Sequence, residues 1–276
     1  MKDRFSTIML ILVLLVGLSL LLYPTVSDYW NSMHQTKAIS VYSDDVANLN
    51  EEKYQKLWTD AVEYNHRLLD RENPYLVTDE QKAHYESLLN LSGTGIMGYV
   101  EIPSINVTAP IYHGTEESIL QVAIGHLEWT SLPTGGESTH CVISGHRGLP
   151  SARLFTDLDQ LVTGDLFMLQ ILDETLTYQV DQILIVEPDV TEDLLIEEGK
   201  DYCTLLTCTP YGVNSHRMLV RGKRVENLPE QVTIRITADA IQVDPLIVAT
   251  VVAVPMILML LIGVSIVSTP KRKKKK

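Results

Sequence analysis

Two long stretches without a charged residue stand near the ends of the chain. The first covers residues 6–23, and the second covers residues 246–267. A helix that crosses the hydrocarbon core of a membrane needs about 20 residues, so each stretch is long enough to do so. The pattern therefore predicts two transmembrane helices that flank a more polar middle segment.

The charges beside these stretches predict how the two helices are oriented. Lys2 and Arg4 precede the first stretch, and the basic run 271–276 follows the second. Because positively charged flanks stay on the cytoplasmic side, we expect both ends of the chain inside and residues 24–245 outside. A cleaved signal peptide is the alternative for the first stretch, although no small-x-small cleavage site follows it.

The segment after the first stretch has the periodicity of helices. Within residues 46–70, apolar residues recur at three- and four-residue spacings, which predicts an amphipathic helix. A second, shorter helix is expected to begin after Thr78, a favourable N-cap residue, and to run to Leu91. The turn 73–75 (Asn-Pro-Tyr) separates the two helices. Residues 24–95 are therefore expected to form a helical appendage.

From residue 97 onward the pattern changes to short runs rich in Val, Ile, Leu, Thr and Tyr, interrupted by Pro and Gly. Seven or eight such runs predict short strands in a sandwich or a barrel. Two segments, 118–125 and 151–161, are expected to be helical insertions. The predicted parts are a cytoplasmic N-terminus (1–5), a membrane helix (6–23), the helical appendage (24–95), a β domain (96–227), a linker (228–245), a second membrane helix (246–267) and a basic cytoplasmic tail (268–276).

The charge balance restricts the partners of the middle segment. The chain of 276 residues has 22 basic and 35 acidic residues, and its formal net charge is −13. Eight of the basic residues lie at the two ends, so the middle is more acidic than the whole. This balance argues against a nucleic-acid partner, because phosphate contacts need clustered Lys and Arg. Contact with membrane lipids is expected only at the ends.

The three cysteines are candidates for covalent chemistry. An odd number in an exported domain leaves at least one free thiol. Cys208 closes the apolar run TLLT and precedes Thr-Pro-Tyr-Gly, so it lies where a strand gives way to a loop and a side chain becomes reachable. Cys141 and Cys203 lie inside strand-like runs and are expected to be buried.

A reactive thiol needs a base or a cation nearby, because its ordinary pKa of about 8.5 leaves it mostly protonated at neutral pH. Among eight histidines, His146 is favoured because glycines bracket it in a strand-to-loop turn like that of Cys208. The adjacent pair His216 and Arg217 is the other candidate. The spacing contains neither Cys-x-x-Cys nor His-x-x-x-His, so we expect no zinc site, no other metal and no cofactor.

Several segments around these residues share the features of one family. The cysteine region reads TLLTCTPYGVNSHRMLVRG, and the histidine region reads THCVISGHRG. Both resemble the sortases, whose signature is Thr-Leu-x-Thr-Cys followed closely by a strand that carries Arg. GHLEWTSLP and SARLFTDLDQLVTGD resemble stretches of the pilus-assembling class C sortases. The similarity covers residues 98–225, and the predicted hairpin topology with its basic tail also fits class C.

The resemblance implies a fold and a set of roles. The fold would be mainly β, a closed barrel of about eight strands with helical insertions and the helical appendage. Cys208 would be the nucleophile, His146 the general acid and base, and Arg217 the group that stabilises the oxyanion and the substrate backbone. Arg217 is favoured over Arg221 because it matches the family's Arg nine residues after the nucleophile.

The resemblance also implies a reaction and its partners. An LPxTG-like sorting signal would be cleaved between Thr and Gly through a thioester and transferred to the lysine amine of a pilin. Anchoring of surface proteins to peptidoglycan is the alternative reaction. The protein would then act at the surface of a Gram-positive cell, from the plasma membrane. A non-catalytic, membrane-tethered binding domain is the hypothesis outside the enzyme class.

One feature departs from the class C pattern. Many class C sortases carry a lid over the site with an Asp-Pro-aromatic tripeptide, and this sequence has none. Its nearest equivalent is Asn73-Pro74-Tyr75, within a lid loop at 70–78. Our hypothesis is that Tyr75 plugs the Cys208 site without the usual Asp to pair with Arg217. An ordinary turn between two helices is the equally weighted alternative.

The other two cysteines have a shared offset. Cys141 precedes His146 by five residues, and Cys203 precedes Cys208 by five. If the two strands are parallel and adjacent, as in the family's sheet, these two cysteines are cross-strand neighbours. Disulfide geometry between adjacent parallel strands is poor, so two buried thiols are favoured over a bond.

Overall fold

The structure, a computed structural model, describes residues 2–227 and residue 257. The predicted linker, the basic tail and, apart from residue 257, the second apolar stretch at 246–267 lie outside the described residues. The chain divides after Trp30 into two compact parts, and the second part, which begins at Asn31, contains the β domain.

The first part is helical throughout its described length. The described residues up to Trp30 belong to α1 (Lys2–Ala47), and this helix continues into the second part. It therefore extends well beyond the predicted stretch 6–23. The helix continues because no glycine and, after Pro24, no further proline interrupts residues 25–47. In the part of the chain that the structure describes, α1 is the one helix apolar and long enough to cross a membrane, with a mean hydropathy of 2.8 over its best window. Length and composition of this kind fit a membrane anchor and a signal sequence alike.

Two capped helices follow α1, as the sequence predicts, although with different bounds. α2 (Glu51–Leu68) begins after Asn50, whose side chain accepts a hydrogen bond from the Lys53 amide at 2.8 Å. α3 (Asp79–Ser87) begins after Thr78, which forms a reciprocal capping box with Gln81. The start at Thr78 is confirmed. The predicted end at Leu91 is wrong, because the chain leaves the helix at Leu88 and takes a left-handed conformation at Leu89.

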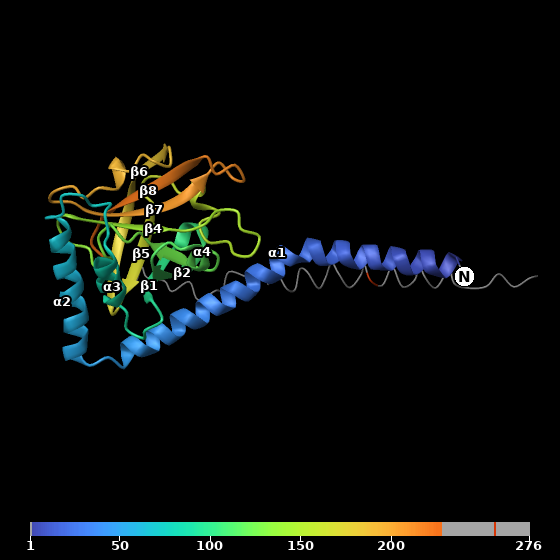
Figure 1. The fold of residues 1–276 in the computed structure, drawn as a ribbon, viewed down its shortest axis with the longest axis horizontal. Helices are drawn as coiled ribbons and strands as arrows, with labels where there is room; N and C mark the ends of the chain where they lie inside the picture. The colour runs from blue at the N-terminus through green and yellow to red at the C-terminus, as the bar shows by residue number, and fades with distance from the viewer. Residues whose placement is uncertain (1, 228–256, 258–276) are drawn as a thin grey trace, which may run out of the picture. The chain divides into compact units, whose positions relative to one another are not determined.

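The helical appendage is fastened to the β domain by buried polar side chains. In the second part of the chain, the Tyr42 hydroxyl donates to the Met97 carbonyl at 2.9 Å and accepts from the Leu172 amide at 2.7 Å. Asn65 of α2 exchanges two hydrogen bonds with the backbone of Leu132, at 2.9 and 2.7 Å. α2 therefore stands along one side of the β domain (Figure 1).

Eight strands form a closed barrel with the order β1-β2-β3-β4-β7-β8-β6-β5. The prediction of a mainly β fold with a closed barrel of about eight strands is confirmed. The strands are β1 (Ile96–Ile102), β2 (Val107–His113), β3 (Ile124–His126), β4 (Thr139–Ser144), β5 (Leu166–Ile171), β6 (Glu174–Val186), β7 (Asp201–Thr209) and β8 (His216–Arg224). Short helical turns between them are η1 (Pro103–Ile105), α4 (Glu117–Leu120), η2 (Leu158–Gln160) and η3 (Glu192–Leu194).

The two predicted helical insertions are largely wrong. In 118–125, the helix α4 ends at Leu120, and the segment from Ile124 is strand β3, which pairs in parallel with β2. In 151–161, only the short turn η2 is helical. Phe155 and Leu158 are fully buried in an otherwise irregular segment, so their apolar spacing reflects burial against the barrel and not a helix.

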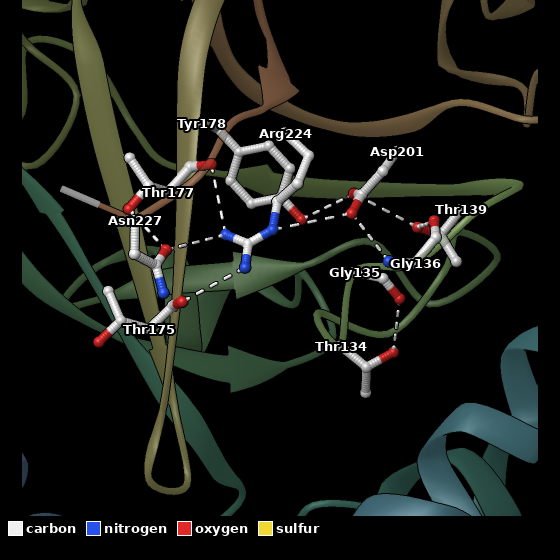
Figure 2. A network of polar contacts seen from close by, with 10 residues as sticks. All are labelled: Thr134, Gly135, Gly136, Thr139, Thr175, Thr177, Tyr178, Asp201, Arg224 and Asn227. Atoms are coloured by element: carbon white, nitrogen blue, oxygen red, sulfur yellow. Dashed lines mark hydrogen bonds and ion pairs between the residues drawn. The ribbon is translucent and has the colours of Figure 1, made fainter.

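A polar network surrounds Asp201, at the start of β7 (Figure 2). The Asp201 carboxylate accepts hydrogen bonds from the Tyr178 hydroxyl at 3.0 Å and the Gly136 amide at 2.8 Å. Arg224 lies 3.9 Å from the same carboxylate and donates to the carbonyl of Thr177 at 3.3 Å. Burial raises the pKa of Asp201 above its usual value, although these hydrogen bonds and the charge of Arg224 act in the opposite direction.

Candidate active site

The last residues of β7 and the first residues of β8 bring Cys208 and Arg217 together. The two strands are antiparallel neighbours, and Cys208 and Arg217 are directly opposite in their register. Side chains opposite one another on an antiparallel pair have Cβ atoms about 4.5–5.5 Å apart and share a face. The spacing of nine residues noted in the sequence is therefore the spacing of a cross-strand pair around the short loop 210–215.

β4 delivers His146 to the same end of the sheet. β4 and β7 run in parallel, and their register pairs Ser144 with Leu206. Beyond this pair, the Gly145 amide donates to the Leu206 carbonyl at 3.1 Å and the Thr207 hydroxyl donates to the Gly145 carbonyl at 2.8 Å. His146 is two residues after Ser144, and Cys208 is two residues after Leu206, the register partner of Ser144. Both residues therefore lie close to the points where their strands give way to loops.

The backbone of His146 is held by the segment behind it. The Phe155 amide donates to the His146 carbonyl at 3.1 Å. Gly145 leaves room for this packing, because a Cβ at that position would lie 2.8 Å from the Phe155 ring and 2.6 Å from Ile124. The imidazole itself is partly exposed, and its Nε2 lies 3.4 Å from a carboxylate oxygen of Glu117, on α4.

The electrostatic setting of the site differs from that of the buried networks. Cys208 is partly exposed. Arg217 donates from Nη1 to the carbonyls of Asn214, at 3.3 Å, and His216, at 3.1 Å. Among the described residues no carboxylate forms an ion pair with Arg217, so its charge and the N–H groups at Nη2 and Nε are left for a bound molecule.

The other two cysteines lie in the interior of the barrel. Cys141 and Cys203 are register partners on β4 and β7, which confirms the prediction that they are cross-strand neighbours. Both are buried and both are free thiols. Burial raises the pKa of the Cys203 thiol well above its ordinary value, and the adjacent Cys141 sulfur adds a smaller effect in the same direction. Neither group is accessible to a large substrate.

A second apolar cluster, distinct from the barrel core, lies on the face that carries Cys208. Leu206 is two residues from Cys208 on β7, and Leu219 is two residues from Arg217 on β8, so all four share that face. We call these side chains the outer cluster: the buried Val142, Leu194 and Leu219 with the partly buried Leu127, Trp129, Leu184, Val186 and Leu206. The partly buried members of the cluster, such as Leu206, leave some apolar area exposed near Cys208.

The loop 70–78, for which the sequence suggests a role as a lid, lies against this outer cluster. The ring of Tyr75 meets that of Trp129 edge-on, with centroids 4.9 Å apart. The Tyr75 hydroxyl accepts a hydrogen bond from Thr191 at 3.0 Å. Pro74 precedes it in a turn closed by a hydrogen bond from the Tyr75 amide to the Asn73 side chain at 3.0 Å. The hypothesis that Tyr75 plugs the Cys208 site itself stays a prediction.

Sequence reasoning missed several side chains around the site. Glu117 contacts His146, Trp129 contributes to the outer cluster, and Arg147 contacts Thr209, the residue after Cys208. Arg147 carried a local signal, since it directly follows His146 in the quoted segment. Glu117 carried no local signal, because only the pairing of β3 with its neighbouring strands brings Glu117 near His146. In the described ranges no group of three or more His, Cys, Asp or Glu side chains could hold a metal ion.

Comparisons with known proteins identify the family of this chain. The sortase domain matches residues 100–225. Sortase D of Bacillus subtilis is 32% identical over 131 residues, which are 46% of this chain and 63% of that protein. The chain thus spans somewhat less than two thirds of this curated relative.

Solved structures match a larger share of the chain. The crystal structure of sortase C1 from Streptococcus agalactiae is 54% identical, has a TM-score of 0.68, and matches 70% of this chain and 100% of its own. Sortase C of Clostridium perfringens, solved with the C-terminal cell wall sorting motif, is 44% identical with a TM-score of 0.62, and matches 70% of this chain and 100% of its own. The chain therefore belongs to the sortase family, and the solved structures that it resembles are those of class C.

Proposed function

We propose that the protein is a cysteine transpeptidase that joins the sorting signal of one protein to an amine of another. The observation that carries this proposal is the cross-strand pair of Cys208 and Arg217, with His146 at the same end of the sheet. A nucleophile, a base and a cation with unused donors are the groups that acyl transfer requires.

The chemistry follows from the residue types. The Cys208 thiolate attacks the Thr carbonyl of the sorting signal, and the oxyanion that forms accepts hydrogen bonds from the free N–H groups of Arg217. His146 protonates the leaving Gly amine as the C–N bond breaks, which leaves a thioester on Cys208. An incoming amine then attacks the thioester carbonyl and passes its proton to the imidazole of His146, which is now neutral. The C–S bond breaks, a new amide bond forms, and the Cys208 thiolate is released.

The outer cluster supports a sorting signal of the LPxTG kind as the donor. Its partly buried members, such as Leu206, leave some apolar area exposed on the face of Cys208, and we infer that the Leu and Pro of such a signal pack there. The related Clostridium perfringens structure is described with a C-terminal cell wall sorting motif, which is the same class of peptide.

We further propose that the acceptor is a lysine amine of a pilin, so that the product is a covalent pilus. The similarity to sortases C supports this choice, and one of them, from Streptococcus pneumoniae, is described in terms of pilin substrate specificity. Attachment of surface proteins to peptidoglycan is the alternative. The active site does not distinguish these acceptors, because both are primary amines.

The proposed location is the outer face of the plasma membrane. The apolar first half of α1 supports an N-terminal anchor. The stretch 246–267, followed by basic residues, supports a second span with both ends of the chain in the cytoplasm and the basic tail on membrane lipids.

The test supplies the full-length protein in detergent with a pilin that carries both an LPxTG-like signal and its acceptor lysine, and with a peptidoglycan stem peptide that carries a free amine. We expect a ladder of covalent pilin multimers on a denaturing gel, which the Cys208→Ala variant does not produce. Pilin joined only to the stem peptide would favour wall anchoring. Absence of any covalent product with either acceptor would overturn the enzymatic proposal.

A further inference from the structure

Arg147, which directly follows His146, has an unusual environment for an arginine. Its side chain is only 9% exposed. One arm of the guanidinium, Nη2, forms an ion pair with Asp159, the middle residue of η2. The other arm, Nη1, donates to the hydroxyl of Thr209 at 3.3 Å. Thr209 is the residue after Cys208, and it is itself buried. The residue after the proposed base thus contacts the residue after the proposed nucleophile.

This contact is one of two side-chain hydrogen bonds that join the ends of β4 and β7 on either side of the site, in addition to the backbone bond from the Gly145 amide to the Leu206 carbonyl. The first link lies just before the site, where the Thr207 hydroxyl donates to the Gly145 carbonyl at 2.8 Å. The second is that of Arg147 with Thr209, just after it. The two links flank His146 and Cys208 on both sides. A pair of links on either side of one residue restricts both its position and its direction.

The energetics favour a geometric role for Arg147 over a packing role. Burying a guanidinium is costly unless it is paired and hydrogen-bonded. Here the Nε group of Arg147 is buried without a hydrogen-bond partner among the described residues, so the pairing is incomplete. An apolar side chain would fill the same space at less cost. A rigid fork that reaches two partners in different directions is what arginine offers and lysine does not.

We propose that Arg147 is a positioning residue that sets the approach of His146 to Cys208, through its fork between Asp159 and Thr209. Asp159 orients the fork from the segment behind the histidine loop, and Thr209 receives it on β7. This inference rests on the proposed function. It adds to the proposed mechanism a residue that affects proton transfer by His146 without contacting the substrate.

The expected kinetic effect falls on chemistry and not on peptide binding. Displacement of a catalytic group by about 1 Å can cost on the order of 10²-fold in rate. We expect Arg147→Met to lower kcat by about 10- to 100-fold and to leave KM within about twofold, because the outer cluster is unchanged. Thr209→Val, which nearly conserves volume, removes only one arm and should lower kcat by a smaller factor.

The experiment uses the full-length protein with a fluorogenic LPxTG-like peptide and, separately, iodoacetamide labelling of Cys208 followed by mass spectrometry across pH. Labelling requires no substrate, so it reports the pairing of His146 with Cys208 even if the peptide is not turned over. The charged groups beside this pair are Glu117, which contacts His146, and Arg217, which is opposite Cys208. Arg147→Met and Thr209→Val leave both of these groups in place. His146→Ala gives the labelling profile of an uncoupled thiol.

A matched control comes from the same segment. Arg153 and Asp157 form an ion pair at 2.6 Å, with the arginine 67% exposed. Arg153→Met should keep the wild-type kcat and labelling profile. The proposal is supported if Arg147→Met shifts the labelling profile toward that of His146→Ala and lowers kcat at constant KM.

Several outcomes would overturn the proposal. One is a folded Arg147→Met protein with the wild-type kcat and profile, and another is a loss of kcat with an unchanged profile, which would indicate a structural role alone. If Arg147→Met does not fold, Thr209→Val decides by the same two readouts. Wild-type protein that never acylates, while its labelling still depends on His146 and Arg147, would refute the proposed function and leave this inference standing.

Discussion

Each end of the β7–β8 pair carries an arginine, but the two arginines differ in how many of their hydrogen-bond donors are used within the protein. At one end, Asp201 and Arg224 belong to a network in which the carboxylate accepts from Tyr178 and Gly136, and the guanidinium also donates to backbone carbonyls (Figure 2). At the other end, Cys208 is partly exposed, and among the described residues its opposite residue Arg217 donates to the backbone carbonyls of Asn214 and His216. The same pair of strands carries both.

The difference separates stability from function. A buried polar group whose partners are all within the protein contributes to the folded state and has nothing left for a ligand. A charged group that is held in place and keeps free donors is ready to meet charge that develops on a substrate. We therefore expect changes at the Cys208 end to affect rate, and changes at the Asp201 end to affect stability.

The largest expected effect is that of Cys208→Ala. Loss of the nucleophile should lower the rate of peptide cleavage by on the order of 10⁴-fold or more, with the free energy of unfolding nearly unchanged. Cys203→Ala, five residues earlier on the same strand but buried, is the matched control and should retain the wild-type rate where the protein is folded. Comparable losses for both variants would remove the distinction between the two kinds of thiol.

Arg217→Gln should have the next largest effect. Removal of an oxyanion donor typically costs about 10²- to 10³-fold in kcat. Lys223→Gln, which removes an exposed positive charge on the same strand, should leave kcat unchanged. The two variants are compared in steady-state cleavage of a sorting peptide. An Arg217→Gln enzyme with the wild-type kcat would show that the cross-strand pair has no catalytic meaning.

Asp201→Asn should change stability and not rate. The amide replaces an acceptor oxygen that serves Tyr178 or Gly136, so we expect a loss of about 1–3 kcal/mol in the free energy of unfolding at pH 4, measured in urea. Because burial raises the pKa of Asp201, the folded protein holds this proton more tightly than the unfolded chain. The wild-type protein therefore loses stability as pH rises from about 4 through the raised pKa, and the cost of Asp201→Asn should be smaller at pH 7.

The control for this variant is its own kinetics. At a temperature where it is folded, kcat should equal that of the wild-type protein. A stability cost that grows with pH, or a rate that falls together with stability, would contradict the assignment of this end to structure.

Tyr75→Ala should have the smallest effect, an increase. Its edge-on contact with Trp129 and its hydrogen bond with Thr191 are each worth about 0.5–1.5 kcal/mol. If the loop covers the outer cluster, loss of these contacts should raise kcat/KM for a sorting peptide about two- to tenfold. Leu76→Ala, an exposed neighbour, is the control. An unchanged kcat/KM, also after deletion of residues 71–77, would end the lid hypothesis.

Local patterns predicted most of the fold, and long-range pairing accounts for the remainder. The alternation of apolar residues identified short strands, and Thr78 identified the start of α3. Whether the strands close into a barrel depends on contacts such as β1 with β5, which alternation alone does not encode. The segment 118–125 was assigned to a helix because the partner that makes Ile124 part of a strand, Ile111, is distant in sequence.

The site was predictable to the extent that its residues follow strand ends. Cys208 and His146 could be identified because apolar runs stop beside them, whereas Arg217 was identified only by the resemblance to the sortases, whose pattern has an Arg nine residues after the nucleophile. The contacts of Arg147 with Thr209 and of Glu117 with His146 join residues 62 and 29 positions apart. Such pairs become neighbours only when β3, β4 and β7 assemble, so no local pattern indicates them.

The most direct measurement is the mass of the acylated protein. Full-length wild-type protein is mixed with an LPxTG-like peptide in the absence of an amine acceptor, quenched in acid, digested and sequenced by mass spectrometry. We predict that the peptide fragment ending in Thr is joined to Cys208 alone, and that hydroxylamine or an added amine removes it. An adduct on another residue, or turnover of the peptide with no acylated Cys208 and full activity in Cys208→Ala, would contradict the account.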